Sequence, residues 1–361
     1  MATFTGTNGG EILPSLLLGP VQALGNDTVN ALGGNDIAIG WAGDDVISGG
    51  SGADVIIGGL LNAAGVITLS GTDTSDYTTS SSGVTVDLST IVNLTLPILG
   101  LNVQLTGASQ GFGGDAEGDY MVGIVNLRGS NANDSLKGSG VANTLEGQGG
   151  NDILHDGGVG TAADTLIGGI GNDTYIVYNG DDVIVEVAGA GSDRVAAGVD
   201  YKLAAGASVE TLNTTNLRAT YAINLTGNEI GQLIRGNDGA NVIDGGRGND
   251  TLYGMGGDDT FRFSTAIGSG NVDRIVDFRA EDDQIELDGS IFTTLAFGAL
   301  SASAFKENTS APRDADDRII YNADTGSLFY DADGAGTASA AVKIAALTPG
   351  LNLSAADFTV V

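Results

Sequence analysis

Residues 40–57 decide the fold of this chain, because they read GWAGDDVIS followed directly by GGSGADVII. The second nonapeptide matches the pattern GGxGxDxUx, in which U is a large apolar residue, and the first departs from it at Trp41, which replaces a repeat glycine. The same phase runs back to residue 25, so that a glycine and, two positions later, an aspartate recur every nine residues. These glycines and aspartates are Gly25, Asp27, Gly34, Asp36, Gly43, Asp45, Gly52 and Asp54.

The pattern returns in two later blocks. The second block keeps the nine-residue phase as far as residue 152, then inserts three residues and resumes. The residues at the aspartate position of the two blocks are Asp134, Asn143, Asp152, Asp164, Asp173, Gln232, Asn241, Asp250 and Asp259. The glycines two positions before four of these residues are Gly150, Gly171, Gly248 and Gly257.

A nine-residue period fits neither the 3.6-residue turn of an α-helix nor a long strand with its period of two. It fits a short strand followed by a tight glycine turn, so that two repeats make one coil of a parallel β-solenoid. Each x-U-x triplet sends its apolar side chain inward, and the glycines let the backbones of stacked coils approach closely. We therefore predict an all-β chain with a thin core.

Aspartates 18 residues apart, such as Asp27 and Asp45, fall on the same edge of successive coils. Carboxylates stacked at the strand spacing of about 5 Å repel each other unless a cation lies between them. Carboxylate oxygens together with carbonyl oxygens of the glycine turns suit a hard cation of calcium size. The predicted calcium ligands are all the aspartate-position residues and glycines named above except Gln232. Asn143 and Asn241 offer weaker, neutral oxygens, and the insertion after Asp152 is expected to break or bulge the ladder.

The composition excludes several classes of function. The formal net charge is −31, which makes nucleic acid and anionic membrane surfaces poor partners. Cysteine is absent and His155 is the single histidine, so disulfide frameworks, thiolate zinc sites and cysteine nucleophiles are excluded. Neither a nucleophile elbow nor a P-loop motif occurs. We therefore expect no catalytic residues and no enzyme activity.

The start of the chain does not look like an export leader. Residues 1–4 carry no basic side chain, and the first basic residue is Arg128. The apolar stretch Ile12–Leu18 is short and interrupted by Pro14. We therefore expect neither a Sec signal peptide nor a transmembrane helix there, and export would need another route.

The nonapeptide resembles the repeat of the hemolysin-type calcium-binding, or RTX, proteins, in which it builds a parallel β-roll. Residues 171–186 are similar to the spacer strands of such proteins, and residues 318–334 resemble their β-rich C-terminal cap. The ending Asp357–Val361, an acidic residue followed by apolar ones, resembles a type I secretion signal. The resemblance implies Ca²⁺ as the bound ion and export in one step by the type I secretion machinery.

The blocks and the stretches between them predict six segments. They are an N-terminal segment with the first β-roll at 1–59, an apolar Ser/Thr-rich β spacer at 60–127, a second β-roll at 128–178, a β spacer at 179–225, a third β-roll at 226–263, and a C-terminal β cap with the secretion signal at 264–361.

The spacer 60–127 leaves two interpretations open. Alternating apolar residues predict strands around Val84–Leu88 and Leu101–Leu105. This segment either supplies the core that the thin rolls lack, or presents an edge strand that joins a neighbouring molecule by β-augmentation. The apolar stretch Ile12–Leu18 poses the same choice.

The sequence as a whole predicts a secreted, extracellular or cell-surface structural protein that binds several calcium ions and folds on extracellular calcium. It is expected to assemble as a surface layer, fibre or adhesin, with further copies of the chain as partners in a homopolymer or lattice, together with cell-surface polysaccharide. Nucleic acid and membrane insertion are not expected. Two alternatives remain: a secreted RTX enzyme or toxin of hydrolase or epimerase type with an unrecognised catalytic region, and a monomeric calcium-binding exoprotein.

Overall fold

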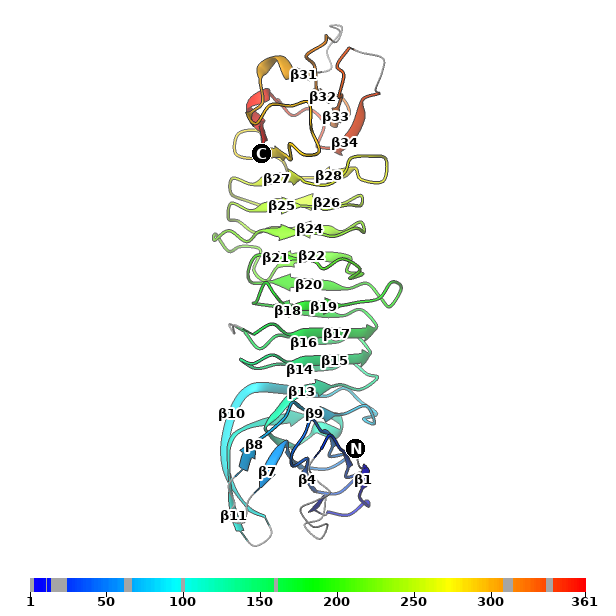
Figure 1. Ribbon diagram of the computed structural model, residues 1–361, viewed down its shortest axis with the longest axis vertical. Helices are drawn as coiled ribbons and strands as arrows, with labels where there is room; N and C mark the ends of the chain where they lie inside the picture. The colour runs from blue at the N-terminus through cyan, green and yellow to red at the C-terminus, as the bar shows by residue number, and fades with distance from the viewer. Residues whose placement is uncertain are drawn as a thin grey trace. The chain divides into compact units, whose positions relative to one another are not determined.

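The computed structural model describes residues 3–10, 12–13, 25–61, 67–98, 101–158, 162–307, 314–335 and 340–361. The chain divides into two compact units, Met1–Asp193 and Arg194–Val361. The described residues form β-strands and three single-turn 3₁₀ helices, and Figure 1 shows the strands of each unit stacked as successive coils. Within these residues, no helix is both long enough and apolar enough to pass through a membrane.

The first unit carries two ladders of short parallel strands. Each strand of the first ladder pairs with the strand one coil further along the chain. Its strands are β1 (Thr3–Thr5), β3 (Thr28–Asn30), β5 (Val46–Ser48), β9 (Asp73–Asp76), β13 (Ile124–Arg128), β15 (Thr144–Gly149), β17 (Thr165–Ile170) and β19 (Val183–Val185). The second ladder contains β2 (Ile12–Leu13), β4 (Ile37–Ile39), β6 (Val55–Ile57), β12 (Tyr120–Val122), β14 (Ser135–Lys137), β16 (Ile153–His155) and β18 (Thr174–Val177).

The core of each coil is made by the apolar position of the repeat. Val29 lies opposite Ile47 in the first ladder, and Ala38 lies opposite Ile56 in the second. All four side chains are buried. Since the register keeps like positions of the repeat in contact, one apolar residue per repeat forms a continuous column, as predicted.

Two antiparallel hairpins interrupt the coils of the first unit. The short one joins β7 (Gly59–Leu61) to β8 (Ile67–Leu69), and the long one joins β10 (Thr85–Ile98) to β11 (Leu101–Phe112). The 3₁₀ helix η1 (Gly114–Ala116) follows the long hairpin. Strand β11 of the long hairpin pairs with β12, and β10 pairs in parallel with β14. The long hairpin therefore forms part of the second ladder of strands.

The long hairpin supplies a second core. Leu105 and Ala108 of β11 are buried against Ile39, Val55 and Ile57, apolar residues that flank the inward positions of β4 and β6. Both predicted strands, around Val84–Leu88 and Leu101–Leu105, are present. The interpretation that the spacer 60–127 supplies core residues is therefore confirmed for Leu105.

The second unit repeats the two-ladder architecture. One ladder contains β20 (Arg194–Ala197), β22 (Thr211–Thr214), β24 (Leu233–Arg235), β26 (Thr251–Tyr253) and β28 (Asp273–Ile275), and it continues in parallel to β34 (Val342–Ala346). The other contains β21 (Tyr201–Lys202), β23 (Leu225–Thr226), β25 (Val242–Asp244), β27 (Thr260–Phe263), β29 (Gln284–Leu287) and β35 (Phe358–Val360).

The remaining strands belong to the end of the second unit. They are β30 (Gly298–Ala299), β31 (Phe305–Glu307), β32 (Ile319–Asn322) and β33 (Ser327–Tyr330), with the 3₁₀ helices η2 (Ala302–Ala304) and η3 (Ala355–Asp357). β32, β33 and β34 pair antiparallel. Phe358 and Val360 are buried, so the residues expected to carry a secretion signal form a paired strand in the folded chain.

The predicted fold class is confirmed: the chain is all-β, with parallel β-solenoid coils built on the nonapeptide. The expectation that the three-residue insertion would break the ladder is wrong. β15 and β17 stay in register across it, because the extra residues fall in the connection between β16 and β17 and not within a strand. Of the apolar stretch Ile12–Leu18, residues 14–18 lie outside the described residues.

Candidate metal centre

The repeat aspartates form hydrogen-bonded ladders along each unit. In each ladder, Oδ1 of one aspartate accepts the backbone N–H of the residue at the same position one coil earlier. Asp45 Oδ1 lies 2.7 Å from the nitrogen of Asp27, and Asp54 Oδ1 lies 2.7 Å from the nitrogen of Asp36. The carboxylates therefore stack along one edge, as the spacing predicted, and all four are buried.

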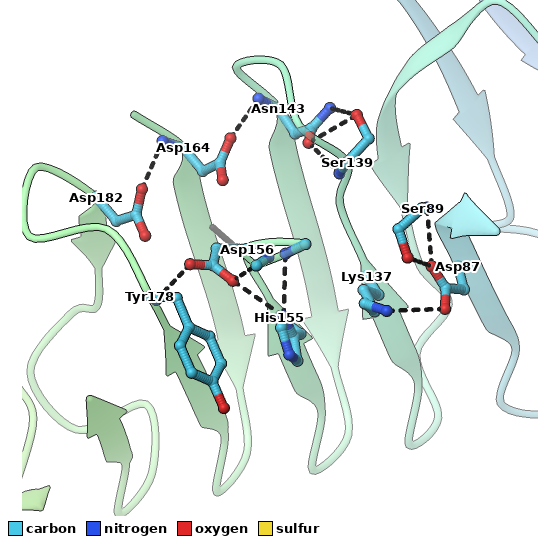
Figure 2. Close-up of polar contacts among 12 residues, drawn as sticks. Asp87, Ser89, Lys137, Ser139, Asn143, His155, Asp156, Asp164, Tyr178 and Asp182 are labelled. Atoms are coloured by element: carbon cyan, nitrogen blue, oxygen red, sulfur yellow. Dashed lines mark hydrogen bonds and ion pairs between the residues drawn. The ribbon is translucent and has the colours of Figure 1, made fainter. Parts of the chain in front are cut away.

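The aspartate ladders of the first unit, unlike its two ladders of strands, are chains of residues linked by hydrogen bonds from a backbone N–H to a side-chain oxygen. They continue beyond the repeats found in the sequence. One runs Asp27–Asp45–Asp73, and a second runs Asp36–Asp54–Asp119. A third runs Asp134–Asp152–Asp173–Asp193, and a fourth runs Asn143–Asp164–Asp182. The two hydrogen bonds of the fourth ladder are drawn in Figure 2. These ladders also cross the three-residue insertion without interruption.

The second unit holds two further ladders. They run Gln232–Asp250–Asp273 and Asn241–Asp259–Asp283, with N···O distances from 2.6 to 3.1 Å. Every aspartate-position residue predicted from the sequence therefore belongs to a ladder.

Sequence reasoning missed six ladder members: insertions shift five of them out of the nine-residue phase, and Asp182 keeps the phase but falls in the segment predicted as a spacer. Five of them have a signal that could have found them, an apolar residue two positions after the aspartate (Met121, Ile184, Val195, Ile275 and Ile285), whereas Ser75 in that position after Asp73 gives none. The missed members are Asp73, Asp119, Asp182, Asp193, Asp273 and Asp283.

The partners of the side-chain oxygens distinguish two kinds of position among eleven of the ladder residues. At one kind Oδ2 is buried and accepts no hydrogen bond from the described residues; we call these open positions. The open positions are Asp45, Asp54, Asp73, Asp152, Asp173 and Asp250. A buried carboxylate oxygen without a donor is costly, so these are the places where a cation would compensate the charge.

At the other kind, which we call closed positions, a backbone N–H four residues earlier caps the side-chain oxygen. Ser130 donates its N–H to Asp134 Oδ2 at 2.6 Å, and Ser139 donates to Asn143 Oδ1 at 2.6 Å; Figure 2 shows the Ser139 contact. The closed positions are Asp134, Asn143, Gln232, Asn241 and Asp283.

The backbone conformation four residues before the ladder position differs between the two kinds, except at the open position Asp73, where Leu69 has no positive φ. Before the open positions Asp45 and Asp152, this residue is Trp41 with φ 72° or Gln148 with φ 76°. Together with Leu32 and Met255, these are the non-glycine residues with positive φ in the described chain, and all four precede a ladder aspartate by four. None of the residues that cap closed positions has positive φ.

A positive φ at a non-glycine residue is strained. Its recurrence at one site of the repeat therefore indicates that the turn is built to direct its N–H away from the carboxylate. The capping residues of the closed repeats at Asn143 and Asn241 are instead Ser139 and Asn237, small polar residues that favour such turns. This was a readable sequence signal.

The asparagine positions are internally satisfied. Asn143 donates its side-chain amide to the carbonyl of Val125 at 2.6 Å, and Asn241 donates to the carbonyl of Ile223 at 2.9 Å. Each carbonyl belongs to the residue 18 positions earlier. At these positions the side-chain amide N–H links two coils. An aspartate there would instead place a carboxylate oxygen, a second hydrogen-bond acceptor, against the carbonyl oxygen.

The glycines of the repeat have two separate packing roles. The glycine five residues before the aspartate leaves room for the carboxylate: a Cβ on Gly40 would lie 2.5 Å from Asp45 Oδ2. The glycine two residues before the aspartate has positive φ and touches the backbone of the preceding coil, as at Gly43, where a Cβ would lie 2.5 Å from the carbonyl carbon of Gly25. The sequence prediction named the second set and missed the first.

The predicted glycines of this second set share this conformation in the described chain: positive φ occurs at Gly34, Gly43, Gly52, Gly150, Gly171, Gly248 and Gly257. Gly25 lacks it, and a Cβ on Gly25 would have nothing within 4 Å. Close packing of the coils is thus a sufficient reason for these glycines, whichever oxygens hold an ion.

Burial perturbs the ladder carboxyls strongly. Burial and then the negative charge of Asp36 raise the pKa of Asp54 to about 7. Burial raises the pKa of Asp119 to about 8, and the charge of Asp54 adds to the effect. Burial, with the charge of Asp273, also raises the pKa of Asp250 to about 8. Without a counter-ion, several ladder aspartates would therefore hold protons near neutral pH.

The donor set fits Ca²⁺. The open positions offer buried carboxylate oxygens, and at Asp152 both Oδ2 and the carbonyl oxygen of Gly168 lie within 2.6 Å of the point that a Cβ on Gly147 would occupy. Neither sulfur nor imidazole is present among the ladder residues. Hard cations prefer such all-oxygen surroundings. His155 stays outside the ladders, where it contacts Asp156 and stacks on Tyr178 (Figure 2).

Comparison with known families gives an independent identification. A model of the RTX calcium-binding nonapeptide repeat matches four stretches, residues 23–56, 128–158, 159–184 and 226–263. Each stretch contains ladder positions described above. No curated protein matches the chain. The four matched copies and the parallel coils that they build show that this chain carries RTX calcium-binding nonapeptide repeats.

Proposed function

We propose that the protein binds several calcium ions along its aspartate ladders, folds when it meets extracellular calcium, and serves outside the cell as a non-catalytic structural protein. One observation carries the proposal: buried carboxylate oxygens at the open positions accept no hydrogen bond from the described residues. The RTX family match supports calcium as the ion.

The ions belong at the open positions and not at the closed ones. At Asp152, Oδ2 is buried without a donor, whereas at Asp134 in the preceding coil the N–H and hydroxyl of Ser130 satisfy Oδ2. At Asn143 and Asn241, the amide N–H already bonds to the carbonyl that faces it. These two asparagines therefore act as hydrogen-bonded links between coils.

Calcium sites of extracellular modules have affinities of about 10⁻⁴–10⁻³ M, so they stay empty in the cytosol and fill outside the cell. A site that forms only on folding adds its binding free energy to stability, about 2.7 kcal/mol at a free calcium concentration 100 times the Kd. The net charge of −31 expands the metal-free chain by self-repulsion. A chain in this state is suited to passage through a type I channel.

Export before folding also agrees with the position of the proposed secretion signal. Phe358 and Val360 are buried in β35, which pairs with β29. A receptor could read these residues only before that strand has formed. Calcium-triggered folding outside the cell removes the conflict between a readable signal and a buried one.

Self-association is supported by apolar side chains that remain exposed on the first unit. Ile170 is 74% exposed and Val187 is 64% exposed. Such residues favour contact with further copies in a layer or fibre, and polysaccharide of the cell surface is a second proposed partner. Electron microscopy of the full chain, with and without calcium, tests this part: calcium-dependent filaments or lattices support it, and dispersed monomers contradict it.

A matched pair of variants tests the calcium sites. Asp152→Asn and Asp134→Asn change the same residue type in adjacent coils of one ladder, and only the first removes an open position. Native mass spectrometry at saturating Ca²⁺ should show at least one ion fewer for Asp152→Asn and the wild-type number for Asp134→Asn. Equal losses would contradict the division into open and closed positions, and a wild-type chain that binds no calcium would overturn the proposal.

A further inference from the structure

Glu186 occupies a position that the repeat reserves for glycine. The register of β17 with β19 places Thr165 opposite Val183, so Gly168 corresponds to Glu186 one coil later. At Gly168 a side chain is impossible, because its Cβ would overlap both Asp173 Oδ2 and the Tyr175 hydroxyl. A buried glutamate at the equivalent position is therefore a departure that needs a physical reason.

The spacing after Glu186 gives it room. The ladder aspartate follows Gly168 by five residues, at Asp173, but follows Glu186 by seven, at Asp193. The two additional residues widen the turn, so that the side chain can enter the coil. Glu186 is only 3% exposed, which places its carboxylate in the interior.

Three buried carboxylates converge there. One oxygen each of Asp173, Glu186 and Asp193 lies within 4.8 Å of the other two, and Asp173 and Asp193 are each 1% exposed. Asp173 uses Oδ1 to accept the backbone N–H of Asp152, at 2.8 Å. Its Oδ2 is buried and has no donor among the described residues.

Asp173 Oδ2 is directed toward the side of the coil that Glu186 occupies. It and the Tyr175 hydroxyl each lie 2.2 Å from the point that a Cβ on Gly168 would occupy, and the same hydroxyl donates a hydrogen bond to Glu186 Oε2. The N–H of Val187 donates to Glu186 Oε1 at 3.0 Å. Glu186 is thus held by one hydrogen bond at each oxygen, with the acceptor of Asp173 beside it.

We infer that Asp173, Glu186 and Asp193 form a divalent-cation site distinct from the repeated ladder sites, in which Glu186 is a third carboxylate that the nonapeptide does not provide. Within the described chain, Asp173 and Glu186 take part in none of the ion pairs with basic residues. Three converging carboxylate oxygens, one of them the donor-free Oδ2 of Asp173, suit a hard cation. The inference rests on the proposed function in two respects: it assumes that the protein binds calcium, and it uses Asp173, which is also an open ladder position.

The electrostatics agree with this geometry. Burial raises the pKa of Glu186 to about 7, and the charges of Asp193 and Asp173 add to the effect. Burial also raises the pKa of Asp173. A cation between the three groups would favour their charged forms and so oppose both shifts.

Binding of Ca²⁺ to the full-length Glu186→Gln variant tests the site, with Glu117→Gln, an exposed carboxylate of the same unit, as the control. Glutamine keeps the shape of Glu186 and its bond with Tyr175. Native mass spectrometry across a calcium titration should show one ion lost, or bound at least about tenfold more weakly, in Glu186→Gln alone. An unchanged number and affinity would overturn the inference while leaving the proposed function intact, whereas a wild-type chain without bound calcium would overturn both.

Terbium luminescence provides a second readout that does not depend on the stability of Glu186→Gln. Tyr175 lies against the site and can transfer excitation to bound Tb³⁺. Tyr175→Phe keeps the buried ring and the three carboxylates. It should lower tyrosine-sensitised emission while preserving the number of bound ions; unchanged emission would contradict a cation at this position.

Discussion

Removal of calcium should make the stability of the protein depend on pH in a direction opposite to ordinary acid denaturation. The ladder carboxyls have pKa values well above the usual 3.8 of aspartate, about 7 for Asp54 and about 8 for Asp119 and Asp250. A raised native pKa means that the folded state holds the proton more tightly than the unfolded chain. The corresponding stability is complete below about pH 4 and is lost as the pH rises through about 7 to 8.

The size of the effect follows from the most buried of these groups. For Asp119, a rise from 3.8 to about 8 corresponds to about 6 kcal/mol, at about 1.36 kcal/mol per pKa unit. Relaxation of the chain and entry of water reduce this figure, so each such group costs on the order of a few kcal/mol at high pH. Several groups together reach the usual net stability of a domain, about 5–15 kcal/mol.

Urea unfolding of metal-free and calcium-saturated protein, followed by circular dichroism between about pH 5 and pH 8, measures the effect. The metal-free chain should retain more β signal and a higher midpoint near pH 5 than near pH 8. Calcium should restore stability at pH 8, because the ion replaces the protons, and it should release protons on binding. Mg²⁺ at the same concentration serves as the ion control. A metal-free chain that is as stable at pH 8 as at pH 5 would refute the reasoning.

Three substitutions test the two kinds of ladder position and the glycine packing. Gln148→Gly should stabilise the calcium-loaded protein by about 0.5–1 kcal/mol in thermal unfolding, because it relieves a positive φ; a loss of stability would contradict this. Asn143→Asp should cost about 1–3 kcal/mol in urea unfolding, through the lost amide donor, and full recovery in calcium would show that the position is open. Gly52→Ala should cost at least about 2 kcal/mol, since φ is +143° and the Cβ would meet backbone. Its control, Gly140→Ala, has open space and should stay within about 0.5 kcal/mol; equal effects would exclude the packing argument.

Much of the fold could be predicted because each element is local. An aspartate, an apolar residue two positions later and a glycine turn fit within nine residues, so Asp45 and Ile47 could be assigned an edge and a core position from the sequence. The apolar strands of the spacer 60–127 were also visible. Their packing was not, because contact between Leu105 and Ile57 joins segments almost fifty residues apart.

The candidate site was predictable only in part for the same reason. Spacing found the phased aspartates but not Asp119, whose ladder partner Asp54 lies 65 residues earlier. The long hairpin between them leaves no periodic trace, although the coils on either side of it stack directly. The inward position of Glu186 depends in turn on the length of the loop that follows it.

The sequence by itself determined the repeat, the strand and turn within it, the column of buried apolar residues and the need for a cation, since these follow from residue types at fixed short spacing. Only the tertiary structure decided which carboxylates stack across insertions, which of their oxygens the backbone caps, and where Glu186 joins Asp173. These choices depend on the register between coils and on the rotation of single peptide groups, such as that at Gln148, and a linear pattern contains neither.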